Sequence, residues 1–357
     1  MKKLSFFVFA ALALSFAACE QLEDIFNNDG DEIMSGTVPS NEIWYTTLDG
    51  YVARPNRTDV FGANIISNTY NNGKGVITFD GDVTAIGFFA FHSSGLTSIT
   101  IPDSVTTIGE NAFSQCDLTS ITIPDSVTTI GDWAFSCCYN LTSVNIPDRV
   151  TTIGDYAFDW CTNLTSATIG NSVTSIGELA FYHCTSLTSV TIGDSVTTIG
   201  NKAFEDCYSL TSVNIPDSVT TIGNLAFAVC NSMTSVNFGD SVTTIGDCAF
   251  YGCLSLTSVN ILDSVTTIGG GAFSGCDLTS VTIGDSITTI GAEAFEGNTS
   301  LTSVYCKATT PPALGWDAFV GNGSDRKIYV PSGSVDAYKS AGYWGEYYAD
   351  AIVGYDF

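Results

Sequence analysis

The segment 210–227, "LTSVNIPDSVTTIGNLAF", decides the fold, because near-copies of it fill most of the chain. Aligned on the last phenylalanine, the copies recur every 22 or 23 residues. This periodicity predicts a solenoid, since one copy cannot bury its apolar face alone and stacked copies share one core. A degenerate copy ends at Phe319, and a partial one begins at Lys327. The ten regular copies end at Phe91, Phe113, Phe135, Phe158, Phe181, Phe204, Phe227, Phe250, Phe273 and Phe295.

Each copy contains two short extended segments. Val213 and Ile215 alternate with Asn214, which is the two-residue period of a strand rich in β-branched residues. Pro216, or glycine in other copies, ends this strand, and the "VTTIG" half predicts a second one. We therefore expect a β-rich repeat solenoid, a rod or arc of about ten coils of 22–23 residues with a cap at each end.

The repeat also identifies a family. Its consensus, L-x-x-V-x-I-P-x-x-V-x-x-I-G-x-x-A-F-x-x-C, extends over residues 76–319. It resembles the BspA-like, or Treponema-type, leucine-rich repeat of bacterial surface proteins. The resemblance implies a leucine-rich repeat solenoid that functions in adhesion. A parallel β-helix is the alternative architecture, because it also stacks short strands.

The segments that flank the repeats predict two caps, which would cover the apolar ends of the solenoid. Residues 35–75 contain two β-rich runs around Asp49-Gly50, a hairpin signal, and we expect an N-terminal β cap here. Residues 320–357 are rich in aromatic side chains and predict a C-terminal cap, with a helix that begins at Ser332 or Ser334.

The N-terminus has the pattern of an export signal. In residues 1–18, Lys2 and Lys3 precede an apolar run and two small residues. The next residue, Cys19, stands where a bacterial lipobox has its lipidated cysteine, so we expect an outer-membrane lipoprotein exposed at the cell surface, with this anchor as its only membrane contact. Plain secretion and a retained anchor are the alternatives. The polar, acidic residues 19–34 predict a tether.

The charge of the chain restricts its partners. The net charge is -26, from 11 basic and 37 acidic residues, and Arg149 and Lys202 are the only basic residues between His92 and Ser300. Phosphate contacts require clustered lysine and arginine, so this distribution excludes nucleic acid as a partner. Basic proteins and metal cations would be attracted instead.

A column of cysteines lies three residues after the repeat phenylalanine. We expect buried free thiols, with disulfides between neighbours or a metal site as alternatives. Two further cysteines, Cys137 and Cys248, fall at variable positions and are the better candidates for reactive thiols. The column contains Cys116, Cys138, Cys161, Cys184, Cys207, Cys230, Cys253 and Cys276.

A column of aspartates follows the proline or glycine that ends the first strand. We expect turn residues that bond their own backbone. The alternatives are calcium bridges between coils and O-glycosylation of the Asp-Ser-Val triplets. The column contains Asp103, Asp125, Asp148, Asp194, Asp217, Asp240, Asp263 and Asp285.

The outward strand positions carry an almost uniform series of threonine and serine, which indicates a scaffold. Sequence variation concentrates after the glycine and around the cysteine, where aromatic residues of the kind that dominate binding interfaces occur in neighbouring coils. We predict a partner-binding stripe there, although such rings also serve to cover a coil edge. The predicted residues are Trp133, Tyr139, Tyr156, Trp160, Tyr182, His183, Lys202, Tyr208 and Tyr251.

Nothing in the sequence predicts catalysis. The two histidines, His92 and His183, stand four coils apart without a nucleophile motif, and there is no phosphate loop or dinucleotide fingerprint. We therefore expect no enzyme, no cofactor and no metal. The sequence favours a surface lipoprotein that presents a leucine-rich repeat scaffold for adhesion to proteins or cells, with a protein or glycan ligand. A structural surface-coat protein without a dedicated ligand is the alternative.

Overall fold

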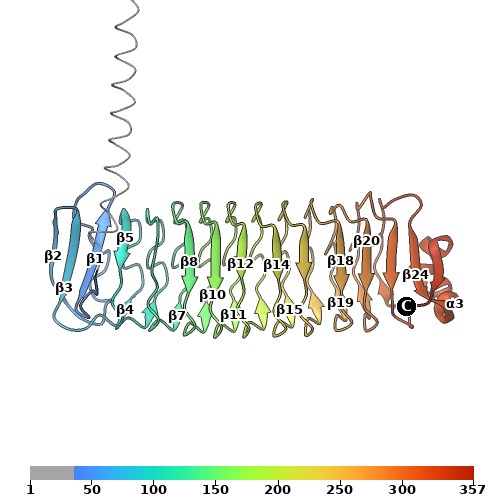
Figure 1. The fold of residues 1–357 in the computed structure, drawn as a ribbon, viewed down its shortest axis with the longest axis horizontal. Helices are drawn as coiled ribbons and strands as arrows, with labels where there is room; N and C mark the ends of the chain where they lie inside the picture. The colour runs from blue at the N-terminus through green and yellow to red at the C-terminus, as the bar shows by residue number, and fades with distance from the viewer. Residues whose placement is uncertain (1–35) are drawn as a thin grey trace, which may run out of the picture.

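Short strands stack along one axis and form an elongated rod (Figure 1). The computed structural model describes residues 36–357, so the predicted signal peptide, Cys19 and the tether lie outside the described residues. The predicted β-solenoid is confirmed, because one parallel sheet runs the length of the rod with one strand from each of eleven coils. No helix among the described residues is long and apolar enough to cross a membrane.

The "VTTIG" half of each coil supplies this long sheet. Its strands are two residues long and pair in register, so that threonine lies beside threonine and isoleucine beside isoleucine in most coils, as in Thr198↔Thr221 and Ile199↔Ile222. The strands are β4 (Ala85–Ile86), β6 (Thr107–Ile108), β7 (Thr129–Ile130), β9 (Thr152–Ile153), β11 (Ser175–Ile176), β13 (Thr198–Ile199), β15 (Thr221–Ile222), β17 (Thr244–Ile245), β19 (Thr267–Ile268), β21 (Thr289–Ile290) and β23 (Ala313–Leu314).

From Ser143 onward, the first half of each coil contributes to a second face made of three parallel sheets, β8-β10-β12, β14-β16 and β18-β20-β22-β24-β25, the last strand of which, β25, follows the helices of the C-terminal cap. Inward valine and isoleucine alternate with outward serine, threonine and asparagine, as the sequence predicts. The strands are β8 (Ser143–Ile146), β10 (Ser166–Ile169), β12 (Ser189–Thr191), β14 (Ser212–Asn214), β16 (Ser235–Asn237), β18 (Ser258–Ile261), β20 (Ser280–Ile283), β22 (Ser303–Cys306), β24 (Lys327–Pro331) and β25 (Ile352–Tyr355).

The core is a stack of phenylalanine rings that continues through all eleven coils. Phe181, Phe204 and Phe227 are fully buried, and consecutive rings are nearly parallel with centroids 5.2 and 5.1 Å apart. The glycine of "VTTIG" permits this close stacking, since a Cβ atom on Gly223 would lie 2.7 Å from backbone atoms of the preceding coil. One coil therefore fits against the next only where this position has no side chain.

The N-terminal end is closed by an antiparallel sheet of β1 (Glu42–Thr47), β2 (Ile65–Asn71), β3 (Lys74–Phe79) and β5 (Leu96–Thr100), in the order β2-β3-β1-β5. The hairpin predicted at Asp49-Gly50 is wrong. Both edges of β1 pair with β3 and β5, so the chain continues as a loop to Ile65. The hairpin lies instead at Asn72-Gly73, whose φ values of 51° and 80° suit the two-residue turn that joins β2 to β3.

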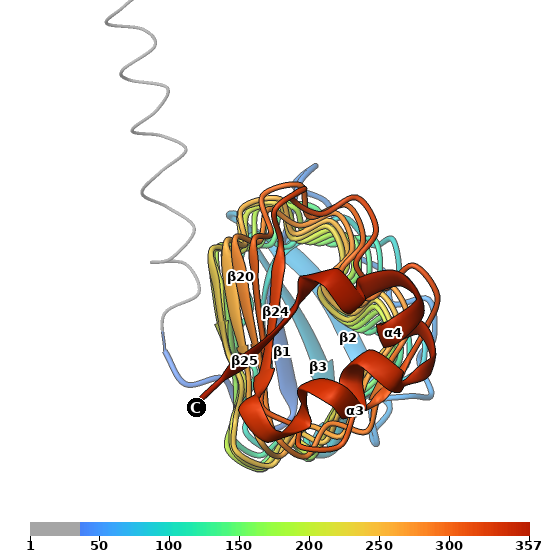
Figure 2. The same cartoon turned by 90° about the vertical axis from the view of Figure 1, so that its right-hand side faces the viewer.

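The C-terminal end is covered by helices that lie across the last coil (Figure 2). They are the 3-10 helix η1 (Ser332–Ser334), α3 (Val335–Ser340), α4 (Gly342–Tyr348) and the 3-10 helix η2 (Ala349–Ala351). The predicted helix start is confirmed, but Ser334 does not cap the helix, because its Oγ donates to the Thr309 carbonyl at 2.8 Å. Trp344 is buried 5.9 Å from the ring of Phe319. These contacts close the apolar core.

Candidate functional site

The turn between the second strand of one coil and the first strand of the next has a fixed and strained backbone. Two positions in each of the eleven coils, two residues before and two after the phenylalanine, have a positive φ. Trp160 and His183 occupy the second position with φ of 57° and 56°. Bulky residues rarely adopt this conformation, and it persists only where surrounding contacts hold it. The Trp160 amide donates to Tyr182 O at 2.8 Å and the His183 amide to Glu205 O at 2.9 Å, which fixes both residues.

Four of the predicted binding residues meet on this turn face. The Trp160 and His183 rings lie 3.9 Å apart between centroids, and Tyr182 lies 6.4 Å from Trp160. Tyr208 meets His183 edge-on at 5.8 Å. Trp160 and Tyr208 are 39% and 37% exposed, so both rings present surface to solvent. Three consecutive coils thus contribute to one group of rings.

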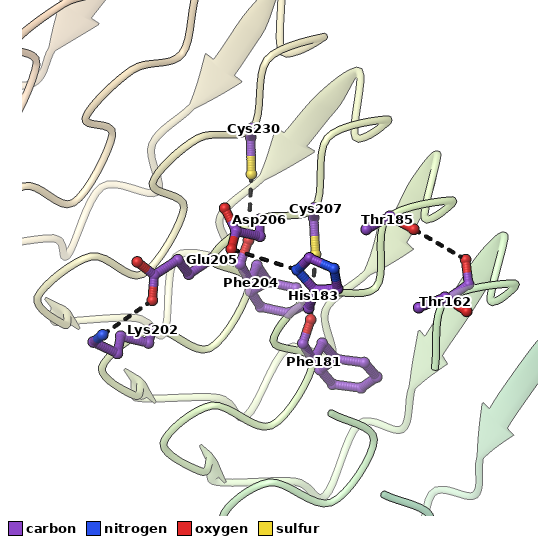
Figure 3. Close-up of polar contacts among 10 residues, drawn as sticks. All are labelled: Thr162, Phe181, His183, Thr185, Lys202, Phe204, Glu205, Asp206, Cys207 and Cys230. Atoms are coloured by element: carbon purple, nitrogen blue, oxygen red, sulfur yellow. Dashed lines mark hydrogen bonds and ion pairs between the residues drawn. The ribbon is translucent and has the colours of Figure 1, made fainter. Parts of the chain in front are cut away.

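Carboxylates lie among these rings. Asp206 Oδ2 is 3.5 Å from His183 Nδ1, whereas Lys202 Nζ lies 3.2 Å from Glu205 Oε2 (Figure 3). Burial, followed by the charge of Asp206, raises the pKa of the Tyr182 and Tyr208 hydroxyls. We call Asp159, Trp160, Tyr182, His183, Asp206 and Tyr208 the aromatic–acidic patch.

Asp159 is the unusual member of the patch. It is only 8% exposed, and its Oδ1 is buried without a hydrogen-bond partner. Burial raises its pKa to about 6, and a hydrogen bond from Ser136 opposes the shift only in part. A buried carboxylate oxygen without a donor is destabilising, so the fold alone does not explain this residue.

The other predicted residues lie apart from this group. Trp133 and Tyr156 form a separate stacked pair at 4.9 Å. Tyr139 and Tyr251 are 50% and 45% exposed and make no ring contact among the described residues. Lys202 forms an ion pair with Glu205. The nine predicted residues therefore form one group of four, one pair and three separate residues.

The carboxylates of the site were not among the residues predicted from the sequence. Asp159 and Glu205 occupy the position directly after the phenylalanine, where the intervening coil has Tyr182. Asp206 occupies the same position in its coil as His183. The sequence signal was present, because these positions vary from coil to coil, but the abundance of acidic residues in the chain masked it.

The cysteine column is structural in its contacts. Cys207 Sγ donates to the Phe181 carbonyl of the preceding coil at 3.3 Å, and Cys230 Sγ to Phe204 at 3.4 Å (Figure 3). All eight thiols of the column are free and buried, and burial raises their pKa. Asn298 continues the column with the same bond, from Nδ2 to the Phe273 carbonyl at 2.8 Å. Cys137 and Cys248 are half-buried free thiols.

Three members of the aspartate column, Asp148, Asp217 and Asp263, join one coil to the next. Asp217 Oδ1 accepts a hydrogen bond from the Asp240 amide of the next coil at 3.0 Å, and Asp148 Oδ1 does the same for Asn171 at 2.8 Å. The expectation that these side chains bond their own backbone is thus wrong, since the neighbouring coil brings its amide within reach. Among residues 36–357, no group of three or more histidine, cysteine, aspartate or glutamate side chains is placed to hold a metal ion.

The outward threonines also bond between coils. Thr220 Oγ1 donates to the Thr197 carbonyl and Thr211 Oγ1 to the Thr188 carbonyl, both at 3.3 Å. The same two contacts recur in most coils, which explains why these positions hardly vary. The threonine ladders therefore stabilise the stack.

The repeat length, the stacked phenylalanines and the paired short strands define a leucine-rich repeat solenoid. The family model described as "BspA type Leucine rich repeat region (6 copies)" matches residues 84–210, 151–277 and 220–341. The chain belongs to this BspA-type leucine-rich repeat family, as its consensus predicts. Among curated proteins, none matches the chain.

One solved structure shows the same architecture, and two others are similar to this chain in sequence. A leucine-rich repeat protein from Bacteroides ovatus is 28% identical, with a TM-score of 0.55, over 77% of this chain and 76% of that one. The leucine-rich repeat protein of T. pallidum is 25% identical, with a TM-score of 0.41, over 60% of this chain and 88% of that one. A protein from Faecalibacterium prausnitzii, described as a leucine rich cell surface protein, is 25% identical, with a TM-score of 0.34, over 78% and 96%. Only the first of these TM-scores exceeds 0.5.

Proposed function

We propose that this chain is a lipid-anchored protein of the bacterial cell surface that binds a protein or glycan partner through its turn face, and that it functions in adhesion. The observation that carries the proposal is the aromatic–acidic patch. Its rings come from neighbouring coils, those of Trp160 and Tyr208 are exposed, and hydrogen bonds between coils hold the backbone of Trp160 and His183 in place. Rigid aromatic side chains of this kind are the usual anchors of protein interfaces.

The rest of the solenoid acts as a scaffold in this proposal. The cysteine and threonine columns bond from coil to coil, and three members of the aspartate column do the same, so these columns supply rigidity rather than recognition. The proposal includes no catalytic step and no cofactor. The lipobox-like Cys19 supports attachment to the outer membrane.

The adhesion test compares two sets of rings on the same rod. Trp160→Ala with Tyr208→Ala removes the exposed rings of the patch, and Trp133→Ala removes one ring of the separate stacked pair. Trp316→Ala is the matched control, because Trp316 is 53% exposed but lies near the C-terminal end. We expect adhesion of cells to matrix or host proteins to fall most for the first variant and to stay unchanged for the control.

The threonine ladders favour a second candidate, a structural coat protein whose repeats supply length and protease resistance. In that case adhesion would be the same for every variant. Protease treatment of intact cells tests the surface location that both candidates share. Release of repeat peptides from unlysed cells is expected, and their protection until lysis would contradict both candidates. A Cys19→Ala variant should lose its lipid and leave the membrane fraction.

A further inference from the structure

Among the described residues, no lysine or arginine pairs with the carboxylates of the aromatic–acidic patch. Asp159 Oδ1 is buried and has no hydrogen-bond partner. The one basic side chain that contacts Asp206 among the described residues is the imidazole of His183. The nearby lysine, Lys202, is bound to Glu205 instead. In the part of the chain that the structure describes, arginine and lysine lie over the rings of Trp44, Phe88, Phe319 and Tyr348, and none lies over a ring of the patch.

We propose that the aromatic–acidic patch binds lysine or arginine side chains of a basic segment in a partner protein. The proposal rests on the proposed function and specifies the chemistry of the partner. A cationic side chain on the exposed face of Trp160 or Tyr208 interacts with the negative face of the ring, while its N–H groups donate to the adjacent carboxylates. A cation held at the patch would also stabilise the buried carboxylate of Asp159, whose Oδ1 has no donor among the described residues.

The charge of the chain favours a cationic partner over a neutral glycan. The net charge of -26 attracts basic segments from a distance and raises their rate of encounter with the rod. A sugar hydroxyl would also donate to Asp159, but a neutral sugar gains nothing from the surrounding charge. The patch gathers Asp159 and Asp206, with Glu205 beside them, on one face.

The spacing of the carboxylates predicts a spacing of basic residues. Asp159 and Asp206 lie two coils apart, which is about 10 Å along the axis at the usual distance between paired strands. Three residues of an extended polyproline II segment advance about 9 Å. A peptide with a basic residue at every third position would therefore place one cation at each carboxylate.

The test is a binding titration with a synthetic peptide. A fluorescent, proline-rich peptide with lysine at every third position is titrated with the whole chain at low and at physiological salt, and its anisotropy is measured. The peptide with glutamine in place of lysine is the neutral probe. We expect the lysine peptide to bind, and the glutamine peptide to bind about tenfold more weakly or not at all.

Variants locate the binding on the rod. Asp159→Asn with Asp206→Asn removes two charges from the patch, and Asp194→Asn with Asp240→Asn removes two exposed charges from the first-strand turns. We expect the first pair to weaken binding about tenfold or more and the second by about twofold or less. Asp159→Asn alone and Trp160→Leu serve as single-site variants, with thermal melts to establish that each is folded.

Three results would overturn the inference. In the first, the two pairs of variants weaken binding equally, which would indicate a general effect of the acidic charge. In the second, the glutamine peptide binds as well as the lysine peptide. In the third, the patch variants change binding only to a glycan array and not to the lysine peptide. If adhesion still depends on Trp160 in any of these cases, the proposed function stands and only the partner chemistry fails. If the lysine peptide binds the patch but adhesion is insensitive to Trp160, the proposed function fails instead.

Discussion

Asp159 should make the free energy of unfolding of the solenoid depend on pH, and the substitution Asp159→Asn should remove this dependence. Its carboxyl group is buried, which raises its pKa to about 6 from the ordinary value of 3.8. Between these two values the unfolded chain has lost its proton while the folded chain keeps it. The group therefore lowers the free energy of unfolding progressively as the pH rises through this window, and the full cost is present above pH 6.

The magnitude follows from the shift. One pKa unit corresponds to about 1.36 kcal/mol, so a shift from 3.8 to about 6 corresponds to about 3 kcal/mol, and residual solvent contact of the carboxyl reduces this to about 2–3 kcal/mol. Asp159→Asn has nearly the same shape and does not ionise. We expect the variant to gain about 2–3 kcal/mol relative to wild type between pH 4 and pH 7. If the amide of the variant changes the free energy of unfolding by a constant amount, that amount is the same at both pH values and cancels when the two are compared.

The assay is urea unfolding of both proteins from pH 4 to pH 8, followed by far-UV circular dichroism. Asp194→Asn is the control, since Asp194 is exposed and its removal changes the net charge equally. The difference between Asp159→Asn and wild type should grow with pH between 4 and 6 and then level off. Parallel profiles for the two proteins would refute the reasoning, because they would show that Asp159 ionises normally in the fold.

Three further predictions concern the packing of the coils. Gly223→Ala should destabilise the rod by about 1–3 kcal/mol, because its Cβ would lie 2.7 Å from the preceding coil, whereas Gly333→Ala, with open space around it, should lower the melting temperature far less. Cys207→Ala should cost about 1–3 kcal/mol in urea unfolding, since it removes the donor to a buried carbonyl, and Cys207→Ser should cost less because it keeps a donor. Thr220→Val should cost no more than about 1 kcal/mol in the same assay, because the backbone amide of residue 220 still donates to the Thr197 carbonyl at 2.9 Å. A larger loss for Thr220→Val than for Cys207→Ala would contradict this ranking.

Repetition made most of the fold predictable. A residue that recurs at one position of every copy has the same neighbours in every coil. The recurrent phenylalanine, such as Phe204, therefore predicts the ring stack, and the recurrent glycine, such as Gly223, predicts the close approach of the backbones. The contacts between coils were harder to predict. The Asp217 side chain reaches an amide 23 residues away, and a single copy of the repeat shows only the local turn.

The ends and the site lack this redundancy. Each cap occurs once, and the choice between Asp49-Gly50 and Asn72-Gly73 as hairpin turn depends on which edges of β1 are already paired. Similarly, the sequence places Trp160 and His183 in one column, but the 3.9 Å contact between their rings follows from side-chain directions that the left-handed backbone sets. Such directions are properties of the folded coil.

Variation along the turn face does not by itself indicate binding. A residue in the threonine or cysteine column bonds to the neighbouring coil and cannot change freely, whereas a residue at the left-handed positions varies because its side chain has fewer such obligations. Asp159 is different from its neighbours in this respect. Ser136 and Ala228 occupy the same position in nearby coils without burying a charge, so the fold accepts an uncharged residue there. A buried carboxylate that destabilises the coil is best explained by a cationic partner that compensates it, which makes Asp159 the residue on which the binding proposal should first be tested.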